Sequence, residues 1–151
     1  VPLDAKPGSP PLLANNYGYV SISHCKDALL LGWSKSPIGV DIERKDRKFS
    51  YEKIINKLFN DCEKKLIDKG NPMLRRENAL KIWISKECIV KLTRTNLFNS
   101  FYDWELYNDC LIKHRKTKTS YNFYHLNFLN WIIGITFKKE KDTNIKPIVC
   151  F

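Results

Sequence analysis

The order of apolar and polar positions predicts short strands, then helices, then strands again. Three strands are expected early in the chain, at residues 17–24, where apolar and polar positions alternate, and at residues 27–34 and 38–43. Because these strands follow one another closely, we expect an antiparallel meander. The proline-rich residues 1–16 are expected to form an extended lead-in without a helix.

Helical spacing replaces this pattern over residues 51–69, where apolar residues recur every three or four positions. Asn60–Asp61 should divide this segment, because such residues cap helices, and Gly70–Asn71–Pro72 should end it. Residues 73–93 contain neither Gly nor Pro and predict the longest helix.

Four further strands are expected after this helix, separated by turn-forming residues, at residues 101–107, 110–114, 121–128 and 131–138. The predicted fold class is therefore α+β, with an antiparallel sheet packed against a long helix.

Composition narrows the class of protein. The 151 residues suit one domain or two small lobes, and the hydrophobic fraction of 43% excludes an intrinsically disordered chain. The five cysteines form no CxxC pair, and no apolar run is long enough to span a membrane, so we expect a cytoplasmic protein with reduced thiols. The net charge of +10 indicates an anionic partner or substrate.

One candidate site lies in Gly39–Val40–Asp41–Ile42–Glu43. A strand's period of two places Asp41 and Glu43 on one face, with Val40 and Ile42 on the other. Paired carboxylates suit Mg²⁺, which prefers hard oxygen ligands. The alternative is a solvated strand end whose acids meet the following basic residues, Arg44, Lys45 and Arg47.

Two further features carry candidate chemistry. Helical spacing aligns Trp83, Glu87 and Lys91 on one stripe, which could equally belong to an ordinary amphipathic helix with a single Glu–Lys pair. Ser23–His24 ends a strand and would suit a phosphate, although a lone histidine is more often a structural residue.

In their order along the chain, these elements resemble the 4'-phosphopantetheinyl transferases of the surfactin-synthetase-activating type. The resemblance rests on Lys6–Pro7, Ser23–His24, Gly39–Glu43 and Trp83–Lys91, and it covers residues 5–97. It implies a 4'-phosphopantetheinyl transferase-like fold of two lobes related by a pseudo-twofold axis. Residues 1–37 would be the tail of the first lobe and residues 38–151 the second lobe.

The resemblance implies a transferase that moves the 4'-phosphopantetheine arm of coenzyme A to a serine of an acyl or peptidyl carrier protein, releasing 3',5'-ADP. Such carriers serve fatty-acid, polyketide or nonribosomal peptide synthesis. By this resemblance Mg²⁺ would be bound by Asp41, Glu43 and Glu87. The implied catalytic residues are Glu87, Lys91 and Asp41. The implied coenzyme A contacts are Lys6, Ser23, His24, Lys86 and Lys91.

The expected partners are coenzyme A and an acidic carrier protein, which agrees with the basic charge of this chain. Self-association is expected if the first lobe is absent, because an uncovered lobe surface would be apolar. One alternative is a catalytically inactive relative that still binds carrier proteins. Another is a basic nucleic-acid-binding module, which leaves the three acids unexplained and would use Lys113, Arg115, Lys116, Lys118, Tyr121, Phe123 and Tyr124.

Overall fold

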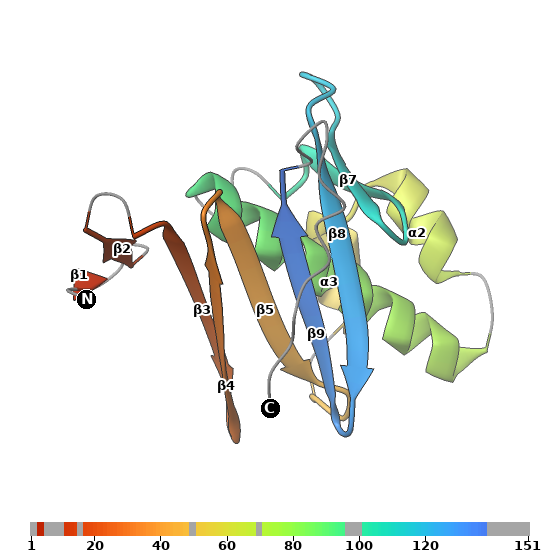
Figure 1. Cartoon of the computed structure of the whole chain (residues 1–151). Coiled ribbons are helices and arrows are strands. Elements are labelled where there is room, and N and C mark those ends of the chain that lie inside the picture. The colour runs from red at the N-terminus through yellow and green to blue at the C-terminus, as the bar shows by residue number, and fades with distance from the viewer. Residues whose placement is uncertain are drawn as a thin grey trace.

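The structure is a computed structural model that describes residues 3–4, 11–14, 17–48, 51–68, 71–95 and 101–138. Its centre is a five-stranded antiparallel sheet in the order β5-β9-β8-β7-β6, with helix α3 across one face (Figure 1). The strands are β5 (Ile38–Arg44), β6 (Trp104–Asn108), β7 (Leu111–His114), β8 (Ser120–Phe128) and β9 (Trp131–Phe137). The predicted class, an antiparallel sheet packed against a long helix, is confirmed.

The second helix begins where its predicted capping residue, Asn60, lies. The helices are α1 (Tyr51–Leu58), α2 (Asp61–Ile67) and α3 (Pro72–Thr93). Asn60 caps α2 in a reciprocal arrangement, because its Oδ1 accepts from the Glu63 amide at 3.0 Å and Glu63 Oε2 accepts from the Asn60 amide at 3.1 Å. Asn71 caps α3, directly before a proline that needs no amide partner. The break near Asn60 and the long third helix are both confirmed.

The predicted meander is wrong in its third strand. Among the described strands, β3 (Tyr19–Cys25) and β4 (Ala28–Ser34) pair only with each other, while β5 pairs with β9. Two serine hydroxyls of β3 satisfy the other edge of β5, because Ser21 Oγ accepts from the Val40 amide at 3.0 Å and Ser23 Oγ from the Ile42 amide at 3.3 Å. Side chains therefore replace a backbone ladder between β3 and β5. In the proline-rich lead-in, β1 (Leu3–Asp4) pairs with β2 (Leu12–Leu13).

Two apolar clusters lie against the two faces of β5 and β9. The cluster on the helix side joins α3 residues such as Ile84 and Cys88 to Phe123 and Ile132 of the sheet. The cluster on the other side contains Val40, Ile42, Ile133, Ile135 and Phe137, with Ala28 and Leu30 of β4 packed against it. The alternation expected for Gly39–Glu43 is therefore confirmed, with Val40 and Ile42 turned away from the helix.

Two glycines allow α3 to lie close to the sheet. A Cβ at Gly39 would stand 1.9 Å from the Cys88 carbonyl oxygen, and one at Gly134 would stand 2.3 Å from Ile84 Cγ2. Any larger residue at either position would push the helix outward. The side chains that α3 turns toward β5 are therefore held at short range by the absence of two side chains beneath them.

The other expectations about organisation stay predictions. The division into residues 1–37 and 38–151, and their relation to two lobes, are not tested by this arrangement. Among the described helices, none has the length and apolarity needed to cross a lipid bilayer.

Candidate functional site

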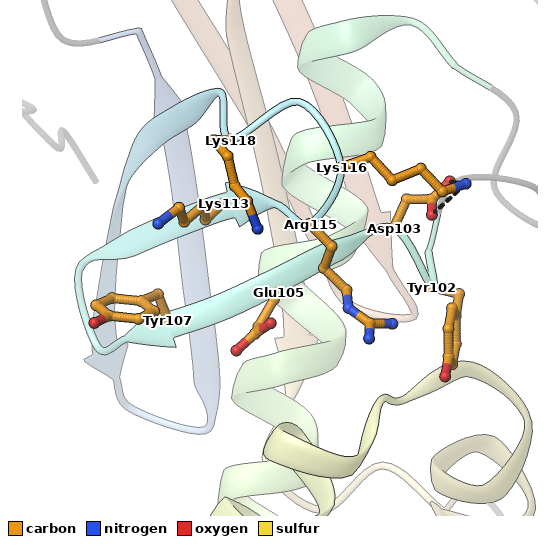
Figure 2. Close-up of a pocket in the computed structure, with 8 residues that line it drawn as sticks. All are labelled: Tyr102, Asp103, Glu105, Tyr107, Lys113, Arg115, Lys116 and Lys118. Carbon is orange, nitrogen blue, oxygen red and sulfur yellow. Dashed lines mark hydrogen bonds and ion pairs between the residues drawn. The ribbon is translucent and has the colours of Figure 1, made fainter.

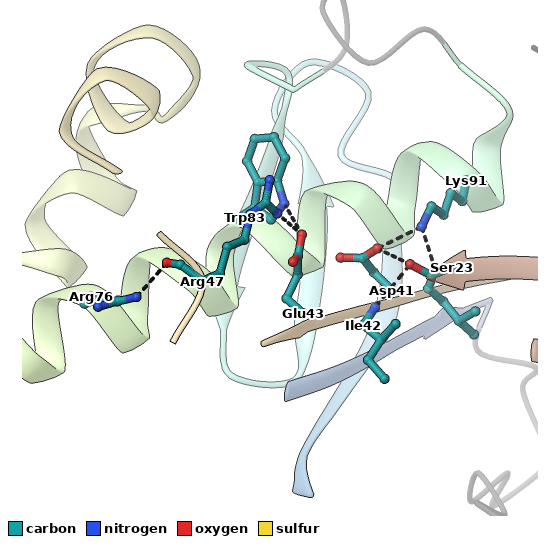
Figure 3. Close-up of polar contacts among 9 residues, drawn as sticks. Ser23, Asp41, Ile42, Glu43, Arg47, Arg76, Trp83 and Lys91 are labelled. Atoms are coloured by element: carbon teal, nitrogen blue, oxygen red, sulfur yellow. Dashed lines mark hydrogen bonds and ion pairs between the residues drawn. The ribbon is translucent and has the colours of Figure 1, made fainter. Parts of the chain in front are cut away.

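Asp41 of β5 is the centre of a polar cluster beneath α3 (Figure 3). Its side chain is buried, and its Oδ1 accepts from Ser23 Oγ at 2.7 Å and from Lys91 Nζ at 2.8 Å. Its second oxygen, Oδ2, is buried without a hydrogen-bond partner in the described part of the chain. A buried carboxylate oxygen is costly to leave unsatisfied, so Oδ2 favours a cation or a donor from beyond the described residues.

Lys91 ties the last turns of α3 to β5. Its ammonium donates to the Val40 carbonyl at 3.1 Å and to Asp41 Oδ1 at 2.8 Å. The side chain is 27% exposed, so the ammonium is reachable from outside while it is held by the strand. Lys91 can therefore place one positive charge beside Asp41 and still face an anionic ligand.

Glu87 lies one helical turn before Lys91 and is strongly affected by the same surroundings. Burial, and then the negative charge of Asp41, raise the pKa of Glu87 to about 7, against the opposing effect of Lys91 and Arg47. Asp41 and Glu87 therefore act on each other across the strand and the helix. A carboxyl group poised near neutrality can accept or release a proton.

Glu43, the second acid of the strand, has different partners. It forms an ion pair with Arg47, and Trp83 Nε1 donates to its Oε1 at 3.3 Å. The Arg47 guanidinium also lies over the Trp83 ring, 5.6 Å from its centroid. Within the described ranges no three His, Cys, Asp or Glu side chains are grouped to hold a metal ion. Glu43 thus lies on the same face of β5 as Asp41, but its carboxylate is bound by Arg47 and Trp83.

Strand alternation separates Ser23 from His24. Ser23 is buried, and its hydroxyl is occupied by Asp41 and the Ile42 amide, so it orients the acid. His24 is exposed at the next position of β3. Contact of either residue with coenzyme A stays a prediction, and Lys6 lies outside the described residues.

The position of Lys86 differs from the one predicted for a contact to coenzyme A. Its side chain is fully buried, and its ammonium donates to Glu63 Oε1 at 3.0 Å and to the carbonyls of Phe101 at 2.6 Å and Trp104 at 2.5 Å. These three acceptors use all the donors of a lysine. The prediction that Lys86 contacts coenzyme A is therefore wrong, because the neighbouring helix and the turn at residues 101–104 enclose it.

Two residues that contact the predicted site residues were not predicted from the sequence. Glu63 was not predicted as a partner of Lys86, because its position three residues after Asn60 indicates only a helix-capping role. Ser21 was also missed, although its spacing of two from Ser23 places both hydroxyls on one face of β3. That spacing was the only available signal.

The three rings expected of a nucleic-acid-binding surface do not form one platform. Phe123 is buried in the core beneath α3. Tyr124 follows it on β8 and stacks on Phe137 with centroids 5.5 Å apart, and Tyr121 packs edge-on against Trp104. Tyr124 faces the opposite side of the sheet from Tyr121 and Phe123, and Phe123 is buried, so these rings cannot stack bases side by side.

Fold and site together define an α+β protein in which a strand carboxylate, a helix carboxyl group and a helix lysine form one polar centre. A sequence model of the 4'-phosphopantetheinyl transferase superfamily matches residues 37–136, which is 100 of the 151 residues and includes all of β5 and α3. The chain belongs to this superfamily, whose members are transferases that act generally on carrier proteins with coenzyme A. A search of curated proteins found no match.

Proposed function

We propose that this chain transfers the 4'-phosphopantetheine arm of coenzyme A to a serine of an acyl or peptidyl carrier protein, releasing 3',5'-ADP. Superfamily membership supports arm transfer in general. The observation that carries the site is the meeting of Asp41 from β5 with Glu87 and Lys91 from α3. The order of Ser23–His24 before the long helix favours the surfactin-synthetase-activating type within the superfamily.

A divalent cation fits this centre. Asp41 Oδ2 is buried without a donor among the described residues, and the ionised form of Glu87 is disfavoured by burial and by Asp41. Both costs would be relieved by an oxygen-seeking ion such as Mg²⁺ bound by Asp41 and Glu87. Glu43 would join them only by leaving its ion pair with Arg47. When bound, the ion would neutralise charge on the pyrophosphate of coenzyme A.

The residues of the chain then have distinct roles. Glu87, which lies beside Asp41 in the centre, accepts the proton of the carrier serine as the serine oxygen bonds to the phosphorus of the arm. The bond from that phosphorus to the oxygen of 3',5'-ADP breaks, and Lys91 stabilises the departing phosphate. Ser23 acts as a positioning residue, because its hydroxyl fixes the orientation of Asp41.

Mass spectrometry of an apo carrier protein tests this function. Incubation with coenzyme A and Mg²⁺ should add one arm, and Asp41→Ala should abolish the addition. The matched control Asp61→Ala changes an exposed acid on α2 and should keep activity. An unmodified carrier in the presence of the wild-type chain would contradict the proposal, and carrier binding that persists without transfer would indicate the inactive relative instead.

A further inference from the structure

The hairpin of β6 and β7 forms a basic pocket that the transfer chemistry does not use (Figure 2). The pocket has a volume of about 570 Å³ and is open to solvent at the edge of the five-stranded sheet. Its cations are Lys113, Arg115, Lys116 and Lys118. They come from one strand and the turn that follows it, so their positions relative to one another are set by a tight hairpin.

Most of this positive charge is not neutralised within the described residues. Lys116 pairs with Asp103 at 3.1 Å, whereas Lys113, Arg115 and Lys118 have no carboxylate at ion-pair distance in the described ranges. A concave surface with an excess of one charge concentrates the electrostatic field, and here four cations face two carboxylates, Asp103 and Glu105. The pocket therefore favours a partner that presents several separate negative groups.

The tyrosines of the pocket indicate which kind of anion fits. Lys113 lies over the ring of Tyr107 at 5.3 Å, and Arg115 lies over the ring of Tyr102 at 4.9 Å. A ring face that already holds a cation is not free to stack a base. The carboxylates of Asp103 and Glu105 also interrupt the basic surface and would repel a continuous phosphate backbone. Discrete carboxylates on a folded protein suit this mixed surface better than nucleic acid does.

The pocket is connected to the polar centre through one aromatic contact. Trp83, which donates to Glu43, packs edge-on against Phe101 with centroids 5.4 Å apart, and Tyr102 of the pocket follows Phe101 in the chain. The same turn receives the buried Lys86 ammonium at the Phe101 carbonyl. The pocket is thus in contact, through this turn, with the helix that carries Glu87 and Lys91. A protein held there would lie near α3 without filling the centre, because β6 and β5 are the two opposite edges of the sheet.

We propose that this basic pocket is the docking surface for the acidic face of the carrier protein. The inference rests on the proposed function, since a transferase of this kind must hold a whole protein while only one serine of that protein enters the centre. The cations of the hairpin supply attraction and orientation, and Glu87 and Lys91 supply the chemistry. Surface charges of this type act mainly on the rate of association and on its dependence on salt.

A charge-neutral variant tests the surface. The pocket variant carries Lys113→Gln, Arg115→Gln and Lys118→Asn, the last chosen because residue 118 has a φ of 62°, which asparagine tolerates. The control carries Lys26→Gln, Lys48→Gln and Lys138→Gln at exposed positions outside the pocket. Each triple variant removes three positive charges and so lowers the net charge from +10 to +7. The two variants differ only in where the charge is lost.

With an apo acyl carrier protein as the probe, the pocket variant should raise KM for the carrier about tenfold. Its kcat and its KM for coenzyme A should be unchanged, and the control should match the wild type. Rising salt should weaken carrier binding to the wild type more than to the pocket variant. An equal effect in both variants, no effect in either, or a higher KM for coenzyme A alone would each overturn the proposal.

A direct binding measurement separates this proposal from the proposed function. If the wild type adds no arm but binds the apo carrier, and only the pocket variant loses that binding, the docking surface stands and the transferase assignment fails. If transfer proceeds with unchanged carrier binding in the pocket variant, the function stands and the docking surface fails. A single-stranded oligonucleotide that binds the wild type and not the pocket variant, while carrier binding is unaffected, would assign the pocket to nucleic acid.

Discussion

The chemistry of this protein is concentrated in a few ionisable side chains whose surroundings differ sharply. Asp41 is paired with a lysine and a serine, and Glu43 with an arginine and a tryptophan. Glu87 has no hydrogen bond or ion pair from its side chain to another described residue. Burial and the charge of Asp41 leave Glu87 with a pKa of about 7. The three acids that the sequence presents as equivalent therefore have separate properties in the folded chain.

Glu87 predicts a specific dependence of stability on pH in the absence of divalent ions. Its pKa is 4.5 in the unfolded chain and about 7 in the folded chain. Below pH 4.5 both states are protonated; as pH rises toward 7 the unfolded chain loses its proton first, so the folded state is progressively destabilised. Above about pH 7 both states are ionised and the cost is constant. Glu87→Gln should remove this cost.

Urea unfolding across this pH range, with a chelator present, measures the effect. The variant should gain on the order of 2 kcal/mol over the wild type between acidic and neutral pH. Glu52→Gln, at an exposed position of α1, is the matched control and should follow the wild type. Parallel curves for the wild type and Glu87→Gln would show that Glu87 does not feel Asp41 and burial as described.

At the scale of elements, a buried ion pair joins three segments of the chain. Lys86 of α3 meets Glu63 of α2, and Glu63 Oε1 also accepts from the Leu106 amide of β6 at 3.2 Å. Burial lowers the pKa of Lys86 and raises the pKa of Glu63, and the attraction between them opposes both shifts. The pair positions the turn at residues 101–104 and, through it, the basic pocket.

Lys86→Met should therefore destabilise the fold by about 3–5 kcal/mol, because it leaves Glu63 buried without its cation. Chemical denaturation measures this loss, and Lys86→Met with Glu63→Gln should recover part of it. Lys81→Met is the matched control on the same helix and should cost less than about 1 kcal/mol, because its ion pair with Glu77 is partly exposed. A stable Lys86→Met protein with a raised KM for coenzyme A would restore the cofactor role.

At the scale of the whole molecule, the outer face of the β3–β4 hairpin is apolar and uncovered by the described chain. Leu29, Leu31 and Trp33 alternate along β4 with exposed fractions of 73%, 61% and 55%. Beside them lies an apolar groove of about 400 Å³ that includes Leu3 and Tyr17. Contiguous apolar surface of this kind usually marks a contact with another protein surface.

Self-association through this face is the expected consequence. Light scattering after size exclusion should show a mass that rises with concentration, and Leu31→Lys should return it to that of a monomer. Leu129→Lys is the matched control, because Leu129 is 70% exposed in the β8–β9 turn and does not line the groove. A monomer at every accessible concentration would contradict this expectation.

Local rules in the sequence accounted for the elements. The helix break at Asn60, the long helix predicted over residues 73–93 and the alternation of Val40 and Ile42 with Asp41 and Glu43 are short-range properties of capping, helix propensity and strand geometry, so they were predictable. The pairing of β5 with β9 was not predictable from local rules. It joins residues that are nearly one hundred positions apart, and it depends on how the sheet packs against α3. The predicted meander assumed that strands adjacent in the sequence pair with each other, and this assumption was wrong for β5.

The sequence by itself determined which side chains could do chemistry and on which face of a strand or helix each would stand, because the backbone period is set locally. Only the tertiary structure decided their partners: Lys91 and Ser23 for Asp41, Arg47 for Glu43, and Glu63 for Lys86. Partner choice depends on the approach of distant segments and on how much water each group loses. Lys86 is therefore buried and has a structural role, whereas Lys91, on the same helix, is partly exposed and contacts Asp41 in the polar centre.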